Sequence, residues 1–315
     1  MECYRNLGLA HYSLSDFRKA IAYHEKSLEI AKDIGDIAGS LKCYGNLGIV
    51  YYGLGDFRKT IEFNEKSLKI ALEIGDKISE SACYTNLGNS YINLGDPDKA
   101  IEFYKKSLNI AKKTGRRAIE STAYGNLGIA CYNSGDFEKA ILYYEKSMEI
   151  LKEIGNLGGE SKCYGNLGNL YHSLGDFIKA IDYQEKALEI DKNIGNLAGE
   201  SACYTNLGIV YYSPGNFKKA IELYEKSVKI ALEIGDKCRE SVTYVDLGDV
   251  YLAKGEFKKA IEHYEKAVKF FKGIGQELYL KKIYEEIAVA YDKLNMHKEA
   301  KEYKITSGEL AGELN

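Results

Sequence analysis

Tryptophan is absent from this 315-residue chain, proline occurs only twice, and long apolar runs are missing. Because a proline inside a helix costs about 3 kcal/mol, so few prolines are typical of a chain that is almost wholly helical. A membrane-spanning helix needs roughly 18 consecutive apolar residues, and no segment approaches that length. We therefore expect no membrane insertion.

The chain also lacks a basic surplus. It has 43 Lys and Arg residues against 46 Asp and Glu residues, for a net charge of -3. Proteins that bind nucleic acid or anionic membrane surfaces normally carry an excess of positive charge. We therefore expect no nucleic acid among its partners.

Patterns that would indicate a metal site or a disulfide framework are missing too. No CxxC motif occurs and the five histidines are scattered, so we expect no zinc site and no cofactor. Five of the seven cysteines recur at one repeat position, which places them farther apart than the about 7 Å between Cα atoms that a disulfide allows. We expect reduced, buried thiols and a cytoplasmic location. The five cysteines are Cys3, Cys43, Cys83, Cys163 and Cys203.

What the chain does contain is a tyrosine at every fortieth position, from Tyr4 to Tyr284, with most of its neighbours recurring beside it. Such a period indicates one supersecondary unit repeated in a stacked array. The register holds throughout, so we expect a single array over residues 1–315. The opening MECYRNLG begins inside a first helix without a cap, which is typical of a fragment of a longer protein. The expected repeats cover residues 1–36, 37–76, 77–116, 117–156, 157–196, 197–236, 237–276 and 277–315.

The repeat over residues 77–116 shows how one unit folds. Apolar residues at helical spacing between Tyr84 and Leu94 indicate a first helix. Asp96 is a good N-cap and Pro97 a good first residue for a second helix, which Gly115 would end. The unit is a helical hairpin whose apolar side is buried only when neighbouring hairpins stack on it.

Glycine recurs in the middle of the first helix, where it costs about 1 kcal/mol relative to alanine. Seven repeats carry it and Ala288 replaces it in the eighth, which predicts a close approach by the partner helix. Alanine marks a second contact point, with Thr60 as the exception. The glycines are Gly8, Gly48, Gly88, Gly128, Gly168, Gly208 and Gly248.

These residues resemble the tetratricopeptide repeat (TPR) pattern. Its aromatic, Leu, Gly, Ala, aromatic and small positions fall, in the fourth repeat, at Tyr124, Leu127, Gly128, Ala140, Tyr144 and Ser147. The ordinary TPR period is shorter, about 34 residues, so the extra length here extends the helices. The resemblance implies an all-α fold, a right-handed TPR superhelical solenoid of eight helix-turn-helix repeats.

The longer unit, with NLGN at residues 86–89, also resembles the Partner-of-Inscuteable/LGN-type adaptors and the large metazoan TPR arrays. This resemblance implies a non-catalytic adaptor that binds a peptide segment of a partner protein in a concave groove lined by the first helices. The implied setting is cell polarity, spindle orientation or signalling scaffolds. The alternative is a structural spacer or self-association module of a larger multidomain TPR protein.

Position 6 of the repeats carries asparagine six times, in every repeat from Asn6 to Asn206. Because asparagine is a weak helix former, the repetition requires a reason. One interpretation is a ladder of amides that grips a peptide backbone, as the LGN-type resemblance implies. The other is that each amide bonds the neighbouring repeat and sets the superhelical pitch.

Positions 9 and 12 vary beside this constant frame. Ligand selectivity would produce such variation, and so would neutral drift. The candidate groove residues at positions 6, 9 and 12 are Asn46, Asn86, Asn89, Asn126, Asn166, Asn169, Asn206, Tyr52, Tyr132, His172, Tyr212, Asp246 and Asp249.

Acidic residues gather in the last two repeats. One interpretation is an oriented ligand with a basic stretch at that end; the more ordinary one is a set of solvated charges partly offset by Lys281, Lys282 and Lys293. The acidic residues are Asp246, Asp249, Glu285, Glu286 and Asp292.

Two other functions lack the residues they need. The TPR clamp for chaperone C-terminal carboxylates requires cations where the best register has Thr85 and Asn166, so we do not expect chaperone binding. No HExxH motif, nucleophile elbow or Cys/His constellation occurs, and His172 is the only histidine expected in the groove. We therefore do not expect an enzyme.

Overall fold

The computed structural model describes residues 1–14, 16–274 and 276–313. Residues 15, 275 and 314–315, which belong to the expected first, seventh and eighth repeats, lie outside the described part. Within the described part the regular structure consists of sixteen α-helices joined by short turns. None of these helices combines the length and the apolar character that a membrane crossing requires.

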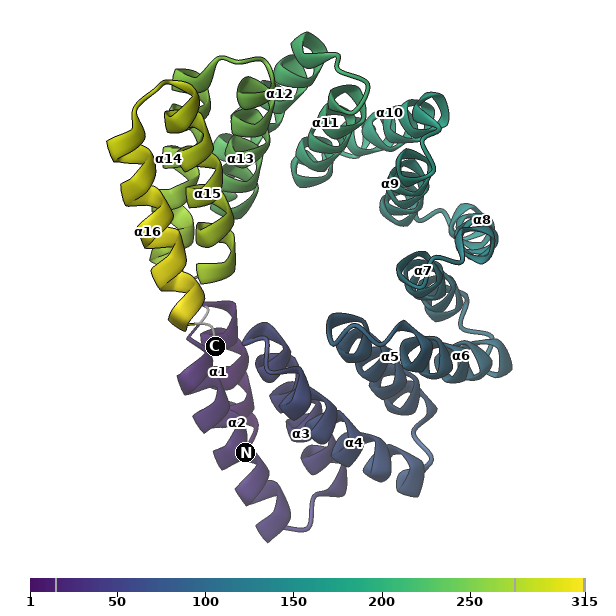
Figure 1. Ribbon diagram of the computed structural model, residues 1–315. Coiled ribbons are helices and arrows are strands. Elements are labelled where there is room, and N and C mark those ends of the chain that lie inside the picture. Colours follow the sequence, from purple (N-terminus) through teal and green to yellow (C-terminus); the bar gives the residue numbers. More distant parts are fainter. Residues whose placement is uncertain (15, 275, 314–315) are drawn as a thin grey trace. The chain divides into compact units, whose positions relative to one another are not determined.

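The chain divides into two compact units of four hairpins each (Figure 1). Unit 1 covers Met1–Asn156, and unit 2 begins at Leu157. Unit 1 contains α1 (Glu2–Ser13), α2 (Phe17–Asp33), α3 (Ile37–Gly53), α4 (Phe57–Ile74), α5 (Lys77–Asn93), α6 (Pro97–Lys113), α7 (Arg117–Asn133) and α8 (Phe137–Glu153). Unit 2 contains α9 (Leu157–Ser173), α10 (Phe177–Asn193), α11 (Leu197–Tyr212), α12 (Phe217–Ile234), α13 (Lys237–Ala253), α14 (Phe257–Gly273), α15 (Glu277–Lys293) and α16 (His297–Glu313).

The helix ends in the third repeat lie where capping chemistry predicts them. The Asp96 carboxylate accepts a hydrogen bond from the backbone N–H of Lys99 at 3.1 Å, and Pro97 is the first residue of α6. Gly115 follows the end of α6 with φ +65°, a left-handed conformation that a residue without Cβ adopts at little cost. Gly95 takes the same conformation in the turn between α5 and α6, and Asn295 takes it in the corresponding turn of the last hairpin, at φ 60°.

The odd-numbered helices form the more closely packed layer of each unit. Besides their hairpin partners they contact one another, as α1 does α3, α5 does α7, α9 does α11 and α13 does α15. Successive even-numbered helices make no comparable contact in the described part of the chain. Because helices on the inside of a curved stack lie closer together, the surface of the odd-numbered helices is the concave side of each unit.

The recurring glycine lies against the side chain at position 24, on the second helix of the same hairpin. A Cβ added at Gly88 would lie 2.4 Å from Cε1 of Tyr104, and one at Gly128 would lie 2.5 Å from Cε1 of Tyr144. The predicted close approach is confirmed, and the contacting group is a side chain. The position-24 residues are His24, Asn64, Tyr104, Tyr144, Gln184, Tyr224 and Tyr264.

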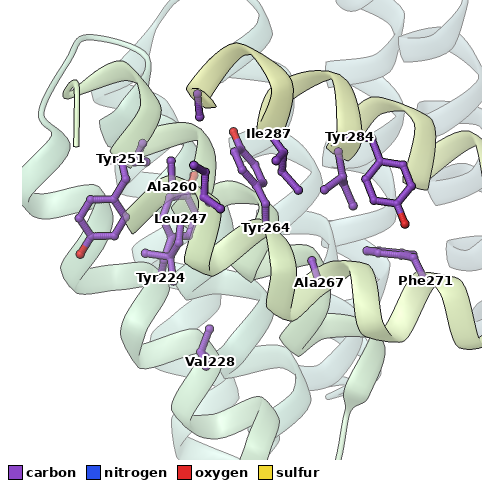
Figure 2. Close-up of a cluster of buried hydrophobic side chains, with 14 of the residues drawn as sticks. Tyr224, Val228, Leu247, Tyr251, Ala260, Tyr264, Ala267, Phe271, Tyr284 and Ile287 are labelled. Carbon is purple, nitrogen blue, oxygen red and sulfur yellow. The ribbon is translucent and has the colours of Figure 1, made fainter. Parts of the chain in front are cut away.

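Stacked hairpins share their apolar cores. In unit 2 one cluster joins α12, α13, α14 and α15, with Tyr224, Leu247, Tyr264 and Ile287 each at most 2% exposed (Figure 2). Residues of successive hairpins thus belong to one buried cluster. Neighbouring repeats therefore stabilise one another by burying apolar surface.

The cysteines divide by exposure. Cys43, Cys83, Cys131, Cys163 and Cys203 are buried, whereas Cys3 and Cys238 are exposed, and all seven are free thiols. The expectation that every cysteine at position 3 is buried is wrong for Cys3. In internal hairpins this position packs on the preceding even-numbered helix, and α1 has no such neighbour among the described residues.

Candidate functional site

The thirteen candidate groove residues all lie on odd-numbered helices, on the concave side of their own unit. Tyr52 and Asn169 are exposed, and the others are half-buried. A surface of half-buried polar groups is suited to binding, because its amides and carboxylates are fixed in place and still reachable.

The position-6 asparagines fall into two groups. Asn86 Nδ2 donates to Asn64 Oδ1 at 3.2 Å, so it bonds the position-24 residue of the preceding hairpin. Asn206 Nδ2 donates in the same way to Gln184 Oε1 at 3.3 Å. The side-chain amides of the other three half-buried members have no hydrogen bond to described residues; these are Asn46, Asn126 and Asn166. Both interpretations of the ladder thus have residues that fit them.

Three polar residues at position 9 accept hydrogen bonds from position 24 of their own hairpin. The donors and acceptors are the Tyr104 hydroxyl to Asn89 Oδ1 at 2.7 Å, Gln184 Nε2 to Asn169 Oδ1 at 2.9 Å, and the Tyr264 hydroxyl to Asp249 Oδ1 at 2.6 Å. The polar residue at position 9 therefore has a structural role in these three repeats.

Position 12 connects neighbouring odd-numbered helices. The Tyr52 hydroxyl accepts from Asn93 Nδ2 at 3.0 Å, and His172 Nε2 lies 2.7 Å from the Ser213 hydroxyl oxygen. Burial lowers the pKa of His172, which favours its neutral form. Ser213, the residue after α11, thereby holds His172, and no carboxylate takes part in that bond to activate the imidazole as a base.

Three carboxylates of unit 2 form an unusual group, the acidic cluster: Asp246, Asp249 and Glu286. Burial, together with repulsion from Asp249, raises the pKa of Asp246 to about 7. Burial is also the main reason why the pKa values of Asp249 and Glu286 are raised. Asp246 Oδ2 is buried without a hydrogen-bond partner in the described part of the protein.

No described lysine or arginine lies within ion-pair distance of this acidic cluster. Lys282 and Arg239 attract Asp246 only from farther away. The other two acidic residues of the last repeats have partners on α16: Asp292 binds Lys304 at 2.6 Å, and Glu285 accepts from the Ser307 hydroxyl at 3.3 Å. The five acidic residues therefore do not form one patch, and Glu285 and Asp292 fit the ordinary interpretation.

Two cavities open among the candidate residues. In unit 1 a cavity of about 180 Å³ brings Tyr52, Asn86 and Asn89 together. In unit 2 a cavity of about 340 Å³ has three of the predicted asparagines in its wall, Asn166, Asn169 and Asn206, beside Lys162 and Arg239.

Sequence reasoning missed two buried residues at these cavities. Asn64 forms part of the first cavity's wall, and Asp191 part of the second, where it accepts hydrogen bonds from Ser161 at 2.6 Å and Asn196 at 2.7 Å. Each departs from the residue that most other repeats carry at its position, tyrosine for Asn64 and alanine for Asp191. That departure was the available signal.

Comparison with known proteins gives one family. The family model described as tetratricopeptide repeat matches residues 1–73, 78–153, 161–233 and 239–304. No curated protein matches the chain.

Several solved structures are similar. BtubC (BKLC) from P. vanneervenii is 27% identical, with 70% of this chain and 92% of that chain covered and a TM-score of 0.60. The apo form of the quorum sensor NprR from B. thuringiensis is 18% identical, with 96% and 86% covered and a TM-score of 0.68. The Rap conjugation gene regulator of plasmid pLS20, solved with the Phr* peptide, is also 18% identical, with 90% and 79% covered and a TM-score of 0.65. At 18% identity the last two show the shared fold alone.

Proposed function

Because the chain belongs to the tetratricopeptide repeat family, we propose that it is a non-catalytic adaptor that binds a peptide segment of a partner protein on its odd-numbered helices. The observation that carries this proposal is the set of unbonded amides at Asn46, Asn126 and Asn166, half-buried on the concave side of their units. An amide both donates and accepts, so such groups suit a peptide backbone of any sequence.

Two similar structures support a peptide ligand. One is a quorum sensor, and another was solved in complex with a peptide. A stack of hairpins provides an extended surface on which a peptide can lie, and side chains at positions 9 and 12 would then select among sequences.

The acidic cluster indicates a basic residue in the ligand. A half-buried carboxylate without a partner is costly, whereas a charge-assisted hydrogen bond from lysine or arginine stabilises it. Asp246 and Asp249 stand where other repeats carry neutral residues such as Asn206 and Ile209. We therefore place a lysine or arginine of the bound segment beside them.

The cellular setting rests on the resemblance of the repeats alone. Their NLGN segments resemble those of Partner-of-Inscuteable/LGN-type adaptors, which leads us to propose a cytoplasmic scaffold in cell polarity, spindle orientation or signalling.

A displayed library of random dodecapeptides, selected on the full chain, tests the proposal. We expect enriched peptides, and those held on unit 2 should contain lysine or arginine. The triple variant Asn46→Ala, Asn126→Ala, Asn166→Ala removes the unbonded amides of both units and should lower peptide affinity at least tenfold, and Asp246→Asn with Asp249→Asn should do so for a peptide held on unit 2.

The matched control is Asn206→Ala, whose amide already bonds the preceding hairpin through Gln184. We expect this control to lower the melting temperature, and the triple variant to leave it unchanged. If no peptide is enriched, or if the triple variant binds as the parent does, the spacer interpretation replaces the adaptor.

A further inference from the structure

One hairpin has no ring or long side chain on its glycine. In four hairpins a tyrosine lies on the position-8 glycine, and those tyrosines are at most 3% exposed; they are Tyr104, Tyr144, Tyr224 and Tyr264. The hairpin α3–α4 keeps Gly48 but carries the shorter Asn64, which is 1% exposed. The space that a phenol ring fills elsewhere is not filled by this amide.

The result is the cavity of about 180 Å³ in unit 1, which is lined by Gly48, Ile49, Tyr52, Thr60, Asn64, Asn86 and Asn89. Ile49 and Tyr52 are 42% and 40% exposed, so the cavity reaches the concave surface. It therefore lies on the surface proposed to hold the peptide.

The buried amide at the base of this cavity needs no hydrogen bond from a ligand. Asn64 Nδ2 donates to the Thr60 carbonyl at 2.8 Å, and its Oδ1 accepts from Asn86. Because the buried amide is satisfied, the remaining wall of Gly48, Ile49 and the Tyr52 ring offers mainly apolar contact. An apolar cavity of about 150 Å³ is large enough for benzene, so one aromatic ring fits here.

The rim can bond the peptide groups on either side of such a ring. Asn89 Oδ1 is taken by the Tyr104 hydroxyl, which leaves its Nδ2 as a donor. Asn86 uses its Nδ2 on Asn64, which leaves its Oδ1 as an acceptor. One donor and one acceptor beside a ring-sized cavity match the backbone groups that flank a side chain in an extended peptide.

We propose that this cavity receives a phenylalanine or tyrosine side chain of the bound peptide, in the place that a tyrosine of the chain itself occupies in four other hairpins. This inference rests on the proposed function and names one side chain that the ligand carries.

The first test needs no partner. Toluene and p-cresol are titrated into the full chain while the methyl signals of isotope-labelled isoleucines are followed by NMR. We expect saturable shifts at Ile49 with a dissociation constant of about 1–10 mM, as befits a fragment with few atoms. The variant Asn64→Tyr should abolish them, because it introduces the ring that four other hairpins carry at this position.

Gln184→Tyr is the matched control, since it makes the same replacement in a hairpin where the glutamine already fills the place through three hydrogen bonds. It should leave fragment binding unchanged. If Asn64→Tyr does not fold, Asn64→Gln, which copies the fifth repeat, takes its place. Absence of saturable shifts in the parent, or their persistence in the filled variant, would overturn the inference.

The second test separates this inference from the proposed function. Peptides that are held on unit 1 of the parent should contain Phe or Tyr and bind at least tenfold more weakly to Asn64→Tyr. If that affinity is unchanged while the triple asparagine variant still loses it, the aromatic site is wrong and the adaptor stands. If no peptide binds, the adaptor itself fails.

Discussion

At the scale of single residues, Asp246 shows how a residue of the proposed binding surface lowers the stability of the fold. Five earlier repeats with half-buried amides carry asparagine at its position, from Asn46 to Asn206. Replacing a neutral amide by a carboxylate that lacks a partner destabilises the folded chain wherever that carboxylate is ionised. A residue present despite such a cost is a candidate for function, since function is where proteins tolerate strain.

The sign of the pH dependence is set by the direction of the shift. The pKa of Asp246 is raised from 3.8 to about 7, so between these values the folded chain binds a proton that the unfolded chain does not. The destabilisation is therefore complete above pH 7, shrinks as the pH falls through 7, and is absent below pH 4.

We expect Asp246→Asn to raise the free energy of unfolding by roughly 1–3 kcal/mol at pH 8 and to leave it unchanged near pH 4. Denaturant titrations of parent and variant across pH 4–8 measure this difference. The control Asp292→Asn should act in the opposite direction at neutral pH, because Lys304 and His297 hold the pKa of that carboxyl below its usual value. A pH-independent difference for Asp246→Asn would contradict the burial of its charge.

At the scale of helices, two glycines of α7 meet different surroundings. A Cβ at Gly128 would lie 2.5 Å from the Tyr144 ring, whereas one at Gly125 would meet only the Ser147 hydroxyl at 3.6 Å. Alanine is a better helix former than glycine by about 1 kcal/mol, so only packing distinguishes the two sites.

We expect Gly125→Ala to stabilise unit 1 by up to about 1 kcal/mol and Gly128→Ala to destabilise it by about 1–3 kcal/mol, the usual cost of overpacking. Thermal and denaturant unfolding of the two single variants measure both effects. Equal changes at the two positions would show that the ring of Tyr144 moves aside without cost.

The same contacts show which features of the fold could be predicted from the sequence alone. Eight copies in one chain made the helix ends and the close approach at Gly88 predictable, because a costly residue that recurs must have a reason. The group that approaches Gly88 is the side chain at position 24 of the same repeat. Only the fold shows that this side chain, Tyr104, lies against the glycine. The departure of Asn64 from tyrosine was a signal for the cavity, but the size of that cavity was not predictable. The buried oxygen of Asp246 was not predictable either, because it depends on what a neighbouring helix fails to supply.

At the scale of the whole molecule, the reaction rates of the cysteine thiols show which hairpins unfold locally. In a nearest-neighbour array a terminal hairpin has one neighbour and an internal one has two, so the ends unfold locally at lower free energy. Cys43 packs against Ser27 and Leu28 of α2, and it becomes exposed when the first hairpin detaches. Cys83 lies on α5, one hairpin farther from that end, where a second hairpin must open first.

We therefore expect the native chain at pH 8 to show two rapidly reacting thiols, Cys3 and Cys238, and five slow ones when it is treated with a thiol reagent. Mass spectrometry of digested samples assigns each rate, and within unit 1 Cys43 should react faster than Cys83. Burial and the nearby Asp191 raise the pKa of Cys203 to about 12, so each measured rate is corrected for the reactivity of its thiolate.

A single common rate for the five slow thiols, equal to the rate expected from global unfolding, would favour the single cooperative array expected over residues 1–315. Rates that differ between the cysteines of unit 1 and those of unit 2 would instead indicate two units that open separately.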